Sequence, residues 1–387
     1  AQKAMVDATI RMVADAIDAK SPYTGGHCTR VPELTFMLAR AACDKTDGPF
    51  ANYTLDEEQW EALYIAGWLH DCGKVTTPEY VVDKATKLET VNNRIHEIRT
   101  RFEVLKRDAQ IDYWRELAQG GDEAALRLQR DARLQALDQD FAFVADCNVG
   151  SEFMSDQKME RLREIAKYAW LRTLDDRVGL SRDELSRYTE PPLPLPVQEF
   201  LLADKPEHRI ARPVSEQMPE SSRWGFAMSV PELLYNHGEL HNLSIRRGTL
   251  TEEERYKINQ HIVLTITMLD ALPLPRHLRA VPEIAGGHHE KLDGTGYPRR
   301  LNAGQLCPEA RMMAIADIFE ALTAADRPYK SGKTLPEALS IMAKMCREQH
   351  LDPDLFALFL RSGVYREYAE KYLSAEQLAV VRIEEYL

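Results

Sequence analysis

The sequence predicts an all-α protein in which a bundle of long helices is inserted into a main helical domain. Apolar residues recur at helical spacing along most of the chain, and capping signals precede several of these segments. Strand signals are almost absent. The 387 residues are enough for one large domain or two ordinary ones with a substantial buried core.

The first part of the main domain, residues 1–83, contains two predicted helices. The first spans residues 4–18, and Thr54 and Glu57 form a capping box for the second, which we expect to stop at Gly73. The apolar face of the first helix comprises Met5, Ala8, Met12, Val13, Ala16 and Ile17.

The stretch from about Lys84 to Gly179 has a different pattern. Its apolar residues alternate spacings of three and four, which is typical of a coiled-coil seam. The first seam comprises Leu88, Val91, Ile95, Ile98, Phe102 and Leu105. Two more helices are expected, one through Leu134, Leu137, Phe141 and Val144 and one through Met159, Leu162, Ile165 and Ala169. We interpret the stretch as an inserted bundle, and ordinary core helices are the alternative.

The remaining boundaries follow from prolines and capping signals. Four closely spaced prolines between 191 and 196 oppose helix and predict an extended connection, so the insertion and its return segment span residues 84–231. Residues 232–387 form the second part of the main domain with C-terminal helices. Capping signals at Thr251 with Glu254 and at Thr334 with Glu337, and Pro308 in a first turn, mark helix starts.

Composition narrows the class of protein. The formal charge of −12 argues against a nucleic-acid polymer as partner, because binding its phosphates needs a basic surface. Six scattered cysteines without a CxxC pair are typical of reduced thiols, so we expect a cytoplasmic protein. No apolar run approaches the roughly 18–20 residues of a membrane-spanning helix. The immediate helical start suggests a longer protein with an upstream sensory domain.

Five of the eleven histidines are candidate metal ligands: His27, His70, His261, His288 and His289. An isolated histidine is more often a surface or core residue than a ligand. The adjacent pair His288–His289 and the doublet His70–Asp71, each with glycine close by, are harder to explain in that way. Asp317, on the helix that Pro308 opens, is a further candidate.

Several segments resemble signatures of one enzyme family. Residues 70–74 (HDCGK) resemble the HDxGK signature of the HD phosphohydrolase superfamily, and residues 288–298 (HHEKLDGTGYP) are similar to the HHExxDGxGYP signature of its HD-GYP subfamily. Residues 23–30 resemble the YTxGHxxR opening, and segments at 316–317 and 327–330 resemble ADxxD and RPYK. Their order is the family's. The chain is identified as a member with an HD-domain helical bundle, matching over 1–83 and about 232–331.

The resemblance implies a set of metal ligands and a mechanism. The ligands are His27, His70, Asp71, His261, His288, His289 and Asp317. If Asp71 bridges, these residues supply four bonds to each of two divalent ions, and octahedral ions keep two open positions apiece. Imidazole and carboxylate ligands favour Fe or Mn, with Zn, Ni or Co as alternatives. The family mechanism uses a metal-bridging hydroxide as the nucleophile, with Asp71 and Lys74 as catalytic residues.

The resemblance also implies substrate contacts. Arg327 and Lys330 are expected to hold a phosphate or guanine, and Lys74 to contact phosphate or hydroxide. Arg30 is expected to orient the site through hydrogen bonds to a ligand carboxylate or to phosphate. Lys74 has the alternative of a solvated lysine at a helix end. The chain departs from ADxxD, because Glu320 replaces the second aspartate, and we expect Glu320 to support a ligand. An extra residue before Arg327 leaves the purine preference open.

The implied activity is hydrolysis of cyclic di-GMP to pGpG and onward to GMP. The alternatives are 3′,3′-cyclic GMP-AMP as substrate and a non-catalytic module that senses a nucleotide or docks a partner. The loop Gly296, Tyr297, Pro298 resembles a surface that contacts diguanylate cyclase domains, so both roles can coexist. The insertion is a candidate for homodimerisation or signalling.

Overall fold

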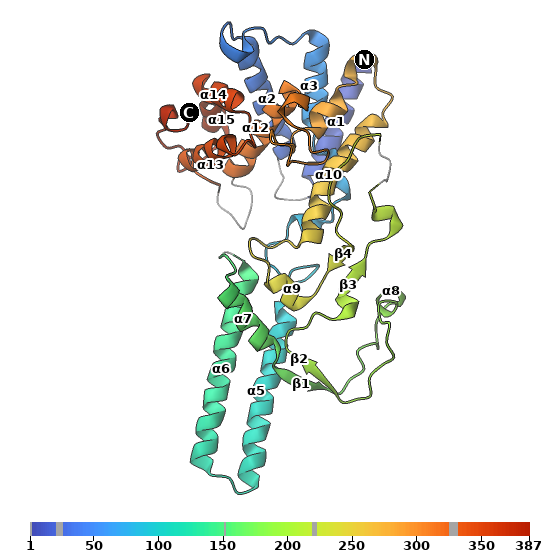
Figure 1. Cartoon of the computed structure of the whole chain (residues 1–387), viewed down its shortest axis with the longest axis vertical. Coiled ribbons are helices and arrows are strands. Elements are labelled where there is room, and N and C mark those ends of the chain that lie inside the picture. The colour runs from blue at the N-terminus through green and yellow to red at the C-terminus, as the bar shows by residue number, and fades with distance from the viewer. Residues whose placement is uncertain (1, 21–25, 151, 219–222, 325–331) are drawn as a thin grey trace. The chain divides into compact units, whose positions relative to one another are not determined.

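The computed structural model describes residues 2–20, 26–150, 152–218, 223–324 and 332–387. Helices dominate these residues, so the all-α prediction is confirmed (Figure 1). The chain divides into two compact units. Unit 1 contains Ala1–Asp83, Met218–Val230 and Lys257–Leu387, and unit 2 contains Lys84–Gln217 and Pro231–Tyr256.

Unit 1 is a helical bundle built around α2 (His27–Cys43). Helices α3 (Glu57–Leu69) and α12 (Pro308–Thr323) pack against α2, and α11 (Val281–Gly286) packs against both α3 and α12. The other helices of the bundle are α1 (Gln2–Asp18), the short α4 (Glu79–Val82), α10 (Glu252–Asp270) from Lys257 onward, α13 (Leu335–Arg347), α14 (Pro353–Arg361) and α15 (Val364–Tyr372). Leu34, Leu38, Leu63 and Phe319 are fully buried in its core.

The predicted face of α1 is wrong except at Ile17, which is buried, and Val13, which is partly buried against the core. The buried side chains are Ile10, Ala14 and Ile17, whereas Met5 and Met12 are 71% and 64% exposed. Apolar residues surround most of this helix, so two different stripes fit a helical period. Packing against α2 and α3 selected the stripe that the period could not distinguish.

Helix α3 begins later and ends earlier than the sequence predicts. Its capping box joins Asp56 and Gln59 through two backbone-to-side-chain bonds of 2.8 and 2.9 Å, so the pairing of Thr54 with Glu57 is wrong. It ends at Leu69, and Cys72–Thr76 form a 3₁₀ turn, η2. The other predicted caps are confirmed: Thr251 with Glu254, Thr334 with Glu337, and Pro308 in the first turn.

Unit 2 is built on a hairpin of two long helices, α5 (Ile95–Ala118) and α6 (Glu123–Val149), with α7 (Asp156–Ala166) and the short α8 (Arg182–Leu185) and α9 (Glu239–Leu243) (Figure 1). Two short antiparallel strand pairs occur in this unit. The first joins β1 (Ala169–Arg172) to β2 (Val197–Phe200), and the second joins β3 (Arg209–Ala211) to β4 (Leu233–Asn236).

Five of the six predicted seam residues are buried, and Val91 is the exception. Val91 is 90% exposed because residues 84–94 are not helical. Leu88 is nevertheless buried, and its backbone N–H donates to Asn148 Oδ1 at 2.8 Å. The third predicted helix ends at Ala166, so Ala169 lies in strand β1 instead.

Two buried lysines tie the start of unit 2 to residues 242–254. Lys84 Nζ donates to both carboxylate oxygens of Glu254 at 2.8 Å, and Lys87 Nζ donates to the carbonyls of Leu243 and Ile245 at 3.0 and 2.7 Å. Burial lowers the pKa of Lys87 to about 8. These bonds explain why residues 231–256 pack with unit 2, although the sequence analysis assigns 232–256 to the main domain. That unit 2 is an insertion stays a prediction.

Phe102 and Val91 provide a matched test of this packing. Phe102 is 3% exposed and meets the Phe141 ring edge-on at 5.4 Å, whereas Val91 contributes little burial. We expect Phe102→Ala to lower the free energy of unfolding of unit 2 by roughly 3–5 kcal/mol. Val91→Ala should leave it unchanged within about 0.5 kcal/mol. Urea unfolding followed by circular dichroism measures both, and equal losses would contradict this packing.

Candidate metal centre

The seven predicted ligands converge within unit 1 from separate elements. His27 begins α2, His70 and Asp71 follow α3, and His261 lies in the middle of α10. His288 and His289 follow α11, and Asp317 lies on α12. Five of them are buried, and His289 and Asp317 are partly buried.

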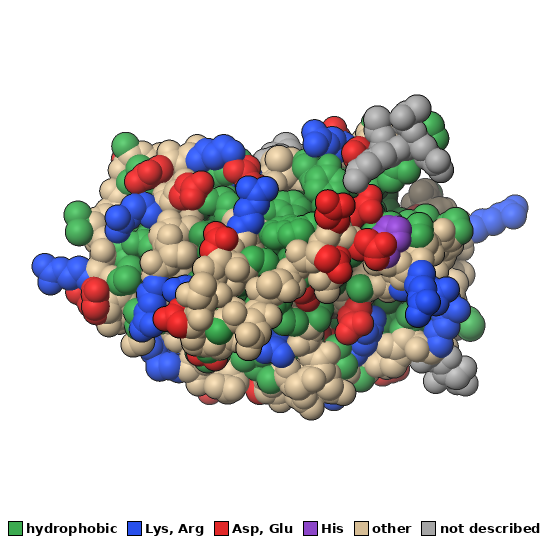
Figure 2. All heavy atoms as spheres, turned by 90° about the horizontal axis from the view of Figure 1, so that it is seen from above, with side chains coloured by type: hydrophobic (Ala, Val, Ile, Leu, Met, Phe, Trp, Pro, Cys, Tyr) green, Lys and Arg blue, Asp and Glu red, His purple; other side chains and the backbone are tan. Residues whose placement is uncertain are grey.

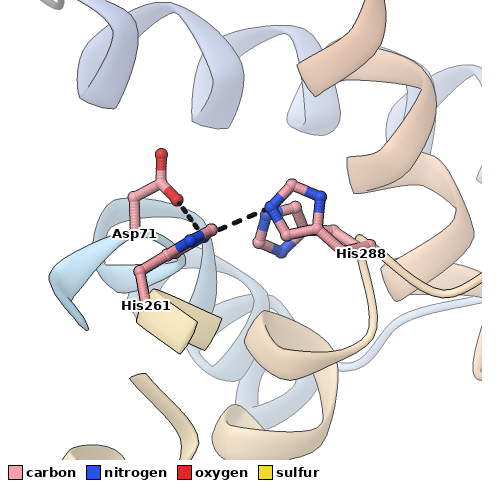
Figure 3. Close-up of side chains that lie close together, drawn as sticks. Asp71, His261 and His288 are labelled. Atoms are coloured by element: carbon pink, nitrogen blue, oxygen red, sulfur yellow. Dashed lines mark hydrogen bonds and ion pairs between the residues drawn. The ribbon is translucent and has the colours of Figure 1, made fainter. Parts of the chain in front are cut away.

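Their ligand atoms form two neighbouring groups. The atoms of His27, His70 and Asp317 lie within 4.8 Å of one another, and so do those of Asp71, His261, His288 and His289. In Figure 3 the side chains of Asp71, His261 and His288 point toward one another from different elements. The structure therefore brings every predicted ligand into one cluster, and their role as ligands stays a prediction.

The carboxylate of Asp71 lies between the two groups. Its Oδ1 is 3.1 Å from His261 Nε2, while its Oδ2 is 3.2 Å from His27 Nε2 and 3.3 Å from His70 Nε2. His27 Nε2 is in turn 3.3 Å from Asp317 Oδ1. One oxygen of Asp71 faces each group, which is the arrangement that a bridging carboxylate needs.

Backbone hydrogen bonds orient three of the imidazoles. In His70, His261 and His288, Nδ1 lies 2.7, 2.6 and 2.7 Å from the carbonyl oxygen three residues earlier. A carbonyl oxygen can only accept, so Nδ1 carries the proton and Nε2 presents a lone pair. The same second contact is usual for metal-bound histidine.

Unpaired polar atoms test whether a metal fits. In the described part of the chain, the buried Nε2 atoms of His27, His70 and His288 and Oδ1 of Asp71 have no hydrogen-bond partner. The 3.1 Å approach of His261 to Asp71 thus lacks hydrogen-bond geometry. Leaving such atoms unpaired costs free energy, and a cation in their midst satisfies them. Imidazoles and carboxylates suit divalent transition metals, so these residues fit a metal centre.

The ionisation states of Asp71, Asp317, His288 and His289 suit metal binding. Burial alone would raise the pKa of Asp71 and Asp317, but Lys74 beside the first and His27 beside the second lower both pKa values. Burial and the neighbouring histidines lower the pKa of His288 to about 4 and that of His289 well below its usual value. Carboxylate and neutral imidazole are the forms that bind metal. At His27, although burial alone would lower the pKa, the carboxylates of Glu320, Asp317 and Asp71 raise it well above its usual value, so a metal must displace a proton there.

Glu320 contacts the His27 imidazole on the side opposite to the cluster. Its Oε2 is 2.6 Å from His27 Nδ1, and its Oε1 accepts from Arg30 Nε and Nη2 at 2.8 and 2.6 Å. Glu320 is 1% exposed, and although burial would raise its pKa, His27 and Arg30 lower it. The carboxylate holds His27 with Nε2 facing the cluster. Arg30 thus reaches the site through Glu320, and its role in binding substrate stays a prediction.

Glycine at position 73 lets the Asp71 turn contact α10. A Cβ atom there would lie 1.9 Å from the carbonyl oxygen of His261, which no side chain tolerates. The Gly73 N–H donates to Thr265 Oγ1 at 2.9 Å. The sequence does not indicate Thr265, because nothing in a helix period marks a threonine as a partner of a distant turn.

Lys74 extends from the same turn to the cluster. Its ammonium group contacts Asp71 Oδ2, and its side chain is 25% exposed. Although burial alone would lower the pKa of Lys74, the charges of Asp71 and Asp317 raise it, so the side chain is a cation. A cation that is partly open to solvent beside the ligand groups can meet an anionic substrate.

The loop after His289 is held by Glu290 and Tyr297. Glu290 is buried and accepts backbone N–H bonds from Arg299 and Leu301 at 2.6 and 2.9 Å. The Tyr297 ring stacks on His289 with centroids 4.8 Å apart, and its N–H donates to the His289 carbonyl at 3.2 Å. Neither residue is among the ligands or substrate contacts that the sequence predicts.

Two predicted substrate contacts, Arg327 and Lys330, lie outside the described residues, as does Tyr23 of the opening motif. On the face that Figure 2 draws, Lys and Arg side chains are scattered among Asp and Glu. Within the described ranges, no helix combines the length and apolar character required to cross a bilayer.

Comparisons with known proteins agree with this geometry. Residues 196–355 match the HD domain family, a range that includes four of the seven candidate ligands. The chain is 38% identical over 110 residues (28% of this chain, 23% of the relative) to the 3′3′-cGAMP-specific phosphodiesterase 3 of Vibrio cholerae. It is 34% identical over 155 residues (40% of this chain, 34% of the relative) to a cyclic di-GMP phosphodiesterase of Pseudomonas aeruginosa.

A third relative is the cyclic di-GMP phosphodiesterase response regulator RpfG of Xanthomonas campestris pv. campestris, with 31% identity over 161 residues (41% of this chain, 42% of the relative). The chain spans about a quarter to two fifths of the length of these three curated relatives. The chain therefore contains a region that is similar to the HD domain, and its signature residues and relatives agree with the HD-GYP family.

Proposed function

We propose that this chain is a metal-dependent phosphodiesterase that hydrolyses a cyclic dinucleotide. The observation that carries the proposal is the Asp71 carboxylate, which faces one group of candidate ligands with each oxygen. Relatives named for cyclic di-GMP and 3′3′-cGAMP support the substrate class. The six cysteines, all in the described ranges, form no disulfide, which agrees with the cytoplasm as the proposed location.

Two divalent ions fit the two groups. His27, His70 and Asp317 would hold one ion, His261, His288 and His289 would hold the other, and Asp71 would contact both. Fe or Mn suits these ligands best, and Zn, Ni or Co is an alternative. When bound, such ions polarise a phosphodiester and lower the pKa of water to make a nucleophile.

The protein's own side chains supply orientation and charge. Glu320, the i−3 carbonyls and Tyr297 hold the imidazoles, and burial of the cluster excludes bulk water from most of it. Lys74 is placed to meet phosphate oxygens beside Asp71. We propose Arg30 as a further contact to phosphate, and Arg327 and Lys330 as contacts to phosphate or guanine.

The leading substrate is cyclic di-GMP, converted to pGpG and onward to GMP, and 3′,3′-cyclic GMP-AMP is the alternative. Metal ligands do not read the base, and the relatives include enzymes named for each. A non-catalytic sensing module is less favoured, because all seven candidate ligands are present and clustered. Docking of a diguanylate cyclase domain on Gly296, Tyr297 and Pro298, and homodimerisation, remain compatible proposals.

The choice of substrate is tested by turnover with both cyclic dinucleotides. We expect hydrolysis of at least one, loss of activity with a chelator, and recovery with Mn²⁺ or Fe²⁺. Chromatography of the products shows whether the reaction stops at the linear dinucleotide. A fully metallated protein that hydrolyses neither compound would support the sensing module instead.

Asp71 tests the shared ligand. Asp71→Ala should remove the carboxylate common to both groups, lower the bound metal below two ions per chain and abolish turnover while the fold persists. The matched control is Asp47→Ala, an exposed aspartate distant in sequence from every candidate ligand. Metal analysis, circular dichroism and an activity assay measure the three properties. Full activity of metal-analysed Asp71→Ala would exclude the two-ion centre.

Lys74 tests charge stabilisation. Lys74→Ala should keep its metal but hydrolyse substrate about 10²–10³-fold more slowly, because no cation then stabilises the negative charge that develops on phosphate. Lys45→Ala, which removes a partly exposed lysine of unit 1, should leave the rate unchanged. An unaltered rate in Lys74→Ala would assign that lysine to the solvated surface.

A further inference from the structure

Residues 223–230 are a part of unit 1 that the site described above does not include. The chain leaves unit 2 after Gln217, contributes Met218–Val230 to unit 1, and enters unit 2 again at Pro231. The sequence analysis assigns this segment to the extended return connection, and it contains no candidate metal ligand. Its contacts show where it lies in unit 1.

The second half of the segment contacts the loop that follows His289. The Ala227 N–H donates to the Pro298 carbonyl at 2.7 Å, and Arg300 Nη2 donates to Ser229 Oγ at 3.1 Å. Ala227 and Ser229 are exposed, so these contacts are made at the surface of the unit. The loop is thus bonded to Glu290 through Arg299 and Leu301 and to Ala227 through Pro298.

The first half of the segment is attached to the end of α10. Trp224 Nε1 donates to Asp270 Oδ2 at 3.2 Å, and Arg223 pairs with the same oxygen. The rings of Trp224 and Phe226 stack with centroids 5.7 Å apart and an interplanar angle of 15°. Because α10 carries His261 and the loop follows His289, the segment joins the supports of two candidate ligands of the same group.

His289 depends on this loop more than the other histidines of its group do. Among the described contacts, its ring donates to no backbone carbonyl, unlike the rings of His261 and His288. Its ring lies beside the tilted ring of His288, with centroids 4.0 Å apart, and its Nε2 is 3.2 Å from His261 Nε2. The ring that stacks on it is that of Tyr297. Tyr297 directly precedes Pro298, the residue that Ala227 holds.

We propose that residues 223–230 are a positioning element of the metal centre: by holding Pro298 they set the place of Tyr297 and, through its ring, the orientation of His289. The inference rests on the proposed function in one respect, that His289 is a ligand. The element acts through Tyr297 and touches neither ion nor substrate.

Ala227→Pro removes the N–H that bonds Pro298, and Ala227→Ser is the matched control because it keeps this donor at an exposed position. The probe is Co²⁺ titrated into the metal-free full chain and followed by visible absorption, which reports the ligand geometry of cobalt. Of the two cobalt ions, we expect Ala227→Pro to bind the one of lower affinity about tenfold less tightly, as loss of a contact that supports a ligand typically does. The visible absorption bands of the bound cobalt should also change. Ala227→Ser should match the unmodified protein.

Steady-state kinetics adds a second measurement. If the group of His289 is displaced, kcat should fall more than KM changes in Ala227→Pro, because substrate contacts such as Lys74 remain. Identical cobalt spectra, affinities and kcat in Ala227→Pro and Ala227→Ser would overturn the inference and leave the metal centre standing. Failure of the unmodified protein to bind two cobalt ions would overturn both.

A second variant keeps the test decisive if Ala227→Pro does not fold. Trp224→Leu combined with Phe226→Leu removes the stacked pair and the Trp224 bond to Asp270 but keeps the Arg223 pair with Asp270 and every backbone N–H. A positioning role predicts the same direction of change in cobalt affinity and spectrum. An unchanged spectrum in this folded double variant would show that the segment does not position His289.

Discussion

The candidate metal centre depends on the close approach of the Asp71 turn to α10. Gly73 has no Cβ, so its backbone can contact the carbonyl of His261, and its N–H bonds Thr265. This contact sets Asp71 between His261 on one side and His27 and His70 on the other. A larger residue at position 73 would therefore push the Asp71 turn away from α10 and separate the two ligand groups, although every ligand residue would be unchanged.

The same cluster illustrates why buried polar groups need a common partner. Each of His70, His261 and His288 uses its Nδ1 for a carbonyl and leaves Nε2 to face the interior of the cluster. In His27 the Nδ1 atom instead contacts the carboxylate of Glu320, which is ion-paired with Arg30. Several Nε2 atoms and an Asp71 oxygen then converge without partners in the described structure, which favours a cation over water as their shared neighbour.

Unit 2 is stabilised by a separate core and by two buried lysines. Leu88, Ile98, Phe102, Leu137 and Leu243 belong to one apolar cluster that shares no residue with the core of unit 1. Lys84 and Lys87 connect the beginning of the unit to residues 242–254, which follow the segment 223–230 in the chain. The polypeptide that builds this second core therefore also supplies the segment that holds the loop after His289.

The sequence by itself predicted the helical class, the starts of α10, α12 and α13, and the residues that cluster as candidate metal ligands. Helical periods and caps depend on neighbours within a few positions, and the motifs place glycine and histidine at short fixed spacings, so all are readable locally. It could not select the buried face of α1, because two apolar stripes fit one helix. Nor could it show that Val91 lies outside the helix of its seam.

Only the tertiary structure decided the contacts between distant residues. Glu320 meets His27 and Arg30 across nearly 300 positions, Thr265 meets Gly73, and Ala227 meets Pro298. None of these pairs has a local spacing rule, because their distances arise when helices pack side by side. Asp71 was readable as a candidate ligand from its neighbours in the chain, but its position between two ligand groups follows from the packing of α2, α3, α10 and α12.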